Sequence, residues 1–111
     1  MSTLSTHVLD AVAGAPARGV AVALSSRADD GDWVEVHAAS TDDDGRVGDL
    51  APGGLAAGVH RLVFDTGAWS AAAGRPCFYP EVAVMFTVED ERHHHVPLLL
   101  SPYAYSTYRG S

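Results

Sequence analysis

The stretch Glu81-Val-Ala-Val-Met-Phe-Thr-Val88 decides the fold class. In an extended backbone successive side chains point to opposite faces, so Val82, Val84, Phe86 and Val88 share one face. An apolar position at every second residue is typical of a β-strand with one buried side. This segment is therefore the clearest strand prediction in the chain.

Glycine, proline and aspartate clusters divide the rest of the chain into segments of similar length. We predict further strands over residues 5–9, 19–24, 33–38, 58–65, 93–100 and 103–108, with a short piece after Arg46. One short helix is predicted between Thr66 and Gly74 because it holds three consecutive alanines, with Thr66 as N-cap and Gly74 as the stop. About seven or eight short strands and one helix indicate an all-β sandwich.

Length and composition limit the possible functions. The 111 residues predict one domain over residues 1–111 with a core large enough to need no disulfide or metal. The net charge is -7, and all seven fixed positive charges are Arg, so neither nucleic-acid binding nor lysine Schiff-base chemistry is expected. Cys77 is the only cysteine, and there is no secretory signal or membrane-length apolar run. We therefore expect a soluble, cytoplasmic protein.

Four features could carry chemistry: His7, Arg46, the triple His93-His94-His95, and the terminal Tyr108-Arg-Gly-Ser111. On a strand, His93 and His95 would share one face while His94 would point to the other. A histidine in a strand is more often structural than catalytic, and an Arg beside a turn is common. Composition and spacing alone thus predict a β-sandwich with a possible histidine site.

Several segments together, in order, resemble one family. They are Ser5-Thr-His-Val-Leu-Asp10, Asp44-Gly-Arg46, Arg61-Leu-Val-Phe-Asp-Thr-Gly67, Phe78-Tyr-Pro-Glu-Val82, His95-Val-Pro-Leu-Leu-Leu-Ser-Pro-Tyr103 and Tyr105-Ser-Thr-Tyr-Arg-Gly-Ser111. From about Leu4 to Ser111 the chain is similar to the transthyretin-related 5-hydroxyisourate hydrolases. The terminal Tyr-Arg-Gly-Ser is the motif that separates these hydrolases from the hormone-carrying transthyretins of the same fold.

The resemblance implies a transthyretin-like β-sandwich of two four-stranded sheets with one short helix. It also implies hydrolysis of 5-hydroxyisourate to 2-oxo-4-hydroxy-4-carboxy-5-ureidoimidazoline in urate breakdown, without cofactor or metal. The residues carried over are His7, Arg46 and His95 as catalytic groups, and Tyr108 and Ser111 as groups that line the substrate site. Of the three neighbouring histidines, His95 is chosen because it directly precedes Val-Pro; which histidine is base and which is acid stays open. Relatives of this type are homotetramers with sites at a dimer–dimer interface, so a homotetramer is expected.

Two other functions are compatible with the same residues. A metal-dependent hydrolase would place zinc on His7, His93 and His95, with an open position for water. A carrier would bind a small aromatic ligand without catalysis, since a fold alone does not separate carrier from enzyme. A cysteine or serine hydrolase is disfavoured because neither Cys77 nor any serine lies in a nucleophile-elbow motif.

Overall fold

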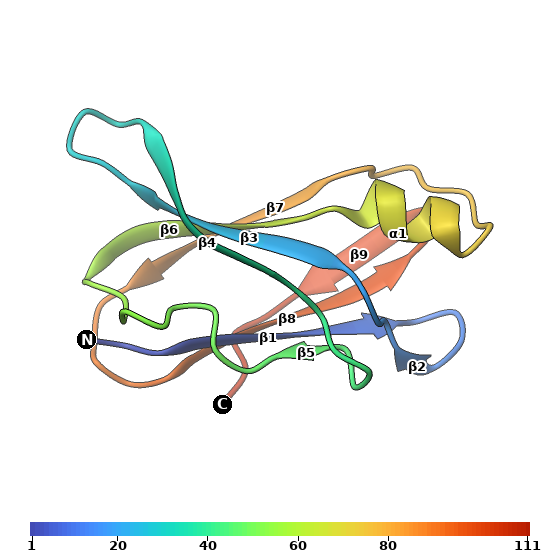
Figure 1. The fold of residues 1–111 in the computed structure, drawn as a ribbon, viewed down its shortest axis with the longest axis horizontal. Helices are drawn as coiled ribbons and strands as arrows, with labels where there is room; N and C mark the ends of the chain where they lie inside the picture. The colour runs from blue at the N-terminus through green and yellow to red at the C-terminus, as the bar shows by residue number, and fades with distance from the viewer.

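The computed structural model describes Met1 to Ser111 as nine strands and one helix (Figure 1). The elements are β1 (Leu4–Asp10), β2 (Ala15–Pro16), β3 (Ala21–Arg27), β4 (Trp33–Ser40), β5 (Arg46–Val47), β6 (Gly58–Phe64), α1 (Thr66–Ala72), β7 (Val82–Val88), β8 (His94–Ser101) and β9 (Ala104–Thr107). Every predicted long strand is present, with ends that differ by up to three residues from the sequence prediction.

The strands form two sheets that face each other (Figure 1). One sheet has the order β2-β1-β8-β9, with β5 also paired to β1, and the other has the order β4-β3-β6-β7. The predicted two-sheet sandwich with one helix is confirmed. The first sheet has five strands where four were expected, because the two-residue strands β2 and β5 pair with different parts of β1. The short piece after Arg46 was predicted and corresponds to β5, whereas β2 was not predicted because two residues show no alternation.

Alternation along each strand separates a core face from an outer face. In β1, Leu4, Thr6 and Val8 are fully buried, whereas Ser5 and His7 between them are only half-buried. In β7 the predicted apolar face is confirmed, since Val82 and Val88 are buried and Val84 and Phe86 pack against the core. The core thus fills the space between the sheets, whereas exposed positions carry polar residues and some apolar ones, such as Val34, Val36 and Met85.

The helix α1 lies where it was predicted, but its cap is different. Asp65, not Thr66, is the N-cap, and its carboxylate accepts a hydrogen bond from the Ala68 backbone N–H at 3.1 Å. Thr66 is buried in the first turn, where its hydroxyl donates to the carbonyl of Tyr79. Gly74 follows the C-cap with φ of 67°, the left-handed conformation that commonly ends a helix.

Candidate active site

The register of three neighbouring strands brings the predicted catalytic residues together. Strand β8 runs parallel to β1 and places His95 opposite Ser5, while β5 runs antiparallel to β1 and places Arg46 opposite His7. Ser5 and His7 are two residues apart in one strand and share its outer face. His7, Arg46 and His95 therefore lie on the outer face of the five-stranded sheet, as the site prediction requires.

His95 is held on this face by a side-chain hydrogen bond and has a shifted pKa. It is half-buried, and its Nδ1 lies 2.7 Å from the Ser5 hydroxyl oxygen. The pKa of the His95 imidazole lies below its ordinary value, first because burial disfavours the charged ring. The positive charges of His7, His93 and Arg46 lower the pKa further. His95 is consequently a neutral imidazole near pH 7, able to accept a proton.

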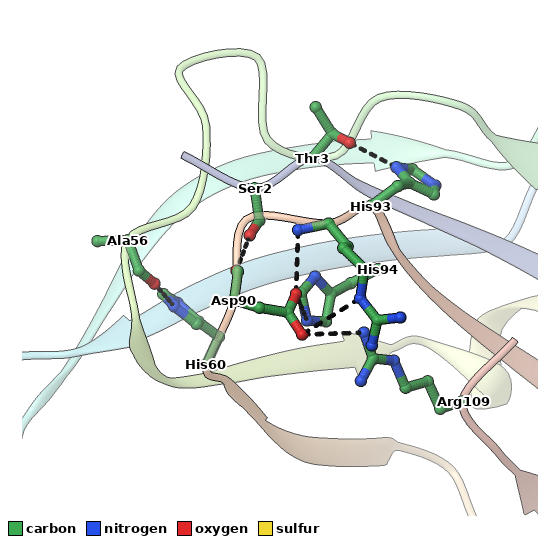
Figure 2. Close-up of polar contacts among 9 residues, drawn as sticks. Ser2, Thr3, Ala56, His60, Asp90, His93, His94 and Arg109 are labelled. Atoms are coloured by element: carbon green, nitrogen blue, oxygen red, sulfur yellow. Dashed lines mark hydrogen bonds and ion pairs between the residues drawn. The ribbon is translucent and has the colours of Figure 1, made fainter. Parts of the chain in front are cut away.

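The other two histidines of the triple differ in their surroundings (Figure 2). His93 is exposed, and its Nδ1 and Nε2 lie 2.6 Å and 2.8 Å from the hydroxyls of Thr3 and Ser5. His94 is buried on the core side, with Nε2 3.9 Å from Asp90 and with Nδ1 unpartnered. The predicted division of the triple between two faces is confirmed.

Arg46 is the charged group of the site that has no counter-ion. Its backbone N–H donates to the Asp42 carboxylate at 2.9 Å, but its guanidinium forms no ion pair, whereas Arg18, Arg75, Arg92 and Arg109 each pair with an aspartate. The side chain is exposed. Its planar fork of N–H donors is therefore free to bind an anionic or carbonyl-bearing ligand.

The C-terminal residues approach the histidines through Gly110. The Gly110 backbone N–H donates to the His95 carbonyl at 2.8 Å, and the two residues form an isolated β-bridge. Tyr108 and Ser111 line a hollow of about 480 Å³ together with His93. His7, Arg46 and His95 do not line this hollow.

Gly110 also has a steric role that the sequence prediction leaves out. A Cβ atom built on Gly110 would lie 2.5 Å from Cδ2 of His95 and 3.2 Å from its Cγ, well inside normal contact distance. Only a residue without a side chain lets the tail run this close to the imidazole. Ser5 is likewise missing from the predicted site, although its position two residues before His7 signals that it shares the same face.

The three histidines that could bind zinc do not form a metal site in this structure. No group of three or more His, Cys, Asp or Glu side chains is arranged to hold a metal ion, so the three-histidine zinc set is not assembled within the chain. Ser5 instead lies between His93 and His95 and hydrogen-bonds to both. The one helix is too short to cross a membrane.

Comparison with known proteins gives consistent matches. A family model described as HIUase/Transthyretin family matches residues 4–110. A 5-hydroxyisourate hydrolase from Salmonella typhimurium is 46% identical over 110 residues, which cover 97% of this chain and 80% of that protein. The Klebsiella pneumoniae 5-hydroxyisourate hydrolase structure superposes with a TM-score of 0.89 at 40% identity, covering 100% of both chains. Sea bream transthyretin in complex with thyroxine superposes with a TM-score of 0.91 at 36% identity, covering 96% of this chain and 93% of that one.

Proposed function

This chain belongs to the HIUase/Transthyretin family, and from that premise we propose that it hydrolyses 5-hydroxyisourate to 2-oxo-4-hydroxy-4-carboxy-5-ureidoimidazoline. The observation that carries the proposal is a neutral, half-buried His95 on the same sheet face as His7 and the unpaired Arg46. Hydrolysis of a cyclic amide needs a base for water, a donor for the developing oxyanion and an acid for the departing nitrogen. These three side chains supply the three functions without a cofactor.

We assign the base to His95. Its lowered pKa keeps the ring neutral, so it can take a proton from water as the water attacks the amide carbonyl. His7, which lies opposite Arg46 in the register, is a second imidazole on this face and is assigned to protonate the leaving nitrogen. Proton transfers of this kind contribute about 10²- to 10⁴-fold each.

Arg46 is assigned to substrate binding and oxyanion stabilisation. Its guanidinium has no partner in the chain and presents two parallel N–H donors, which match the carbonyl groups of a urate-like ring. Tyr108 and Ser111 are assigned as groups that line the substrate site, because the tail that carries them is tied to His95 by the Gly110 hydrogen bond. The terminal carboxylate and the Ser111 hydroxyl are then available to bind water or substrate.

We further propose that residues 1–111 act as one hydrolase domain, that four copies associate, and that the protein works in the cytoplasm. The site occupies the outer face of a sheet and is open on one side within one chain. A second copy covering this face would exclude water from the reacting groups and strengthen their electrostatic effect. The single Cys77 is compatible with a reducing compartment.

The carrier function is the second candidate, since the chain is as similar in fold to a thyroxine-bound transthyretin as to a hydrolase. The decay of freshly made 5-hydroxyisourate, followed by ultraviolet absorbance with chelator present, separates the two. The proposal expects rapid decay with the wild type, loss in His95→Ala, and retention in the matched variant His37→Ala on β4. No acceleration by the wild type would favour the carrier, and loss of activity on chelation would favour a metal enzyme.

A further inference from the structure

Three consecutive hydrogen bonds connect His95 to the surface. The Ser5 hydroxyl oxygen lies 2.7 Å from Nδ1 of His95 and 2.8 Å from Nε2 of His93, and Nδ1 of His93 lies 2.6 Å from the Thr3 hydroxyl. His95 and Ser5 lie in the adjacent parallel strands β8 and β1, and His93 and Thr3 are the residues that directly precede these two strands. Figure 2 shows the outer end of this row, where His93 meets Thr3.

The Ser5 hydroxyl links the protonation of the His95 imidazole to that of the His93 imidazole. A serine hydroxyl has one proton to donate, so Ser5 can donate to only one of the two imidazoles and must accept from the other if both bonds are made. When Ser5 donates to Nε2 of His93, it accepts from a protonated Nδ1 of His95. Each neutral imidazole carries one N–H, so Nε2 of His95 then has a free lone pair.

On the basis of the proposed function, we propose that Ser5 and His93 are positioning residues that hold His95 in this tautomer and receive its proton through the Ser5 hydroxyl. Neither residue touches the substrate in this scheme. They act through His95, as the partner of a catalytic imidazole fixes its tautomer in other hydrolases.

The proton transfer balances within the row. Nε2 of His95 takes a proton from the attacking water and becomes an imidazolium. The Nδ1 proton of His95 then passes to Ser5 Oγ while the Ser5 hydroxyl proton passes to Nε2 of His93. His95 is left neutral with a proton on Nε2, Ser5 is a hydroxyl again, and His93 carries the positive charge. To restore the resting state, the relay runs back to Nδ1 of His95, and Nε2 of His95 releases the proton taken from water to solvent. Solvent in turn replaces the proton that His7 gave to the leaving nitrogen.

The surroundings of the two imidazoles favour this direction. Charge on His95 is opposed by burial and by the neighbouring His7 and Arg46, and these causes lower its pKa. His93 is exposed on the surface, so water can solvate its charged form. The row therefore moves positive charge from a half-buried, electropositive position to solvent.

Three variants test the inference. Ser5→Ala removes the hydroxyl, Ser5→Thr keeps it in a strand that accepts β-branched residues, and His93→Gln keeps a hydrogen-bonding amide that cannot take up a proton. We expect kcat for 5-hydroxyisourate to fall by about tenfold to a hundredfold in Ser5→Ala and His93→Gln, with KM changed less than about twofold, and Ser5→Thr to restore most of kcat. The double variant Ser5→Ala/His93→Gln should lose no more than the worse single variant, because both changes interrupt the same row.

A second measurement does not depend on turnover. The ¹⁵N shifts of the histidine rings report directly which nitrogen is protonated, and we expect Nδ1 of His95 to be protonated in the wild type and Ser5→Thr but not in Ser5→Ala. Full kcat in both Ser5→Ala and His93→Gln, or a wild-type His95 protonated only at Nε2, would overturn the inference. A wild type that does not act on 5-hydroxyisourate would overturn the proposed function instead, with the ring shifts still deciding the tautomer.

Discussion

Gly110→Ala tests the link between the C-terminal residues and the histidine site. The added methyl carbon would lie 2.5 Å from Cδ2, 3.2 Å from Cγ and 3.3 Å from Cβ of His95, all on one side of the imidazole. Carbon atoms normally approach to about 3.5–4.0 Å. Either the His95 ring turns away from its rotamer and from Ser5, or the tail moves and loses the Gly110 N–H bond to the His95 carbonyl.

The expected loss follows from the cost of crowding. Overpacking by one methyl group typically costs about 1–3 kcal/mol, and each 1.4 kcal/mol is tenfold in rate. If the crowding displaces His95 or the tail and the active geometry costs this much more free energy to reach, kcat/KM for 5-hydroxyisourate falls by about 5- to 150-fold. The fold should survive, because Gly110 is next to the terminus and outside the hydrophobic core.

The assay is steady-state hydrolysis of 5-hydroxyisourate together with thermal unfolding. Gly53→Ala is the matched control, since a Cβ there meets nothing within 4 Å and its backbone is not left-handed. We expect Gly53→Ala to keep wild-type kcat/KM. Retention of kcat/KM in Gly110→Ala within twofold, or an equal loss in Gly53→Ala, would refute the steric reasoning.

Three further predictions concern charge. Arg46→Lys should lower kcat/KM by about tenfold or more because a point charge replaces a bidentate fork, while urea unfolding stays unchanged because the exposed guanidinium forms no ion pair. Because His95 acts as a base with a lowered pKa, the acidic limb of the plot of kcat/KM against pH should lie below the ordinary histidine pKa of about 6.5. Arg46→Gln removes a positive charge that lowers this pKa, so the limb should move to higher pH. A limb that does not move would contradict the assignment of His95 as the base. Asp10→Asn should destabilise the fold at pH 7, since the partly exposed Arg75 loses its charged hydrogen-bond partner at 2.6 Å. The hydrogen bond from Arg75 lowers the pKa of Asp10, so this stabilisation is present above the unfolded pKa and is lost as pH falls through the folded value; urea titrations at pH 7 and pH 3 should show the wild type and Asp10→Asn converging.

Local patterns along the chain were enough to predict the class of fold. The strict alternation of apolar residues over positions 81–88 predicts an amphipathic strand. The positions predicted to be buried and exposed agree with those in β7. The same rule placed His93 and His95 on one face and His94 on the other. The helix cap was predicted wrongly because Asp65 and Thr66 both favour that position, and only the packing of Thr66 against the Tyr79 carbonyl decides between them.

The family resemblance identified His7, Arg46 and His95, but tertiary structure alone decided how they meet. Their separation along the chain says nothing about register, which is set by the parallel pairing of β1 with β8 and by the antiparallel pairing of the short strand β5 with β1. The contacts of Ser5 and Gly110 are visible only in the tertiary structure. Ser5 lies within hydrogen-bonding distance of two histidines, and the His95 imidazole occupies the space that a side chain at Gly110 would need. The sequence by itself determines which strand faces are apolar, because alternation is a local property of the chain. The site depends on contacts between segments about 90 residues apart, and only the folded sandwich brings these segments together.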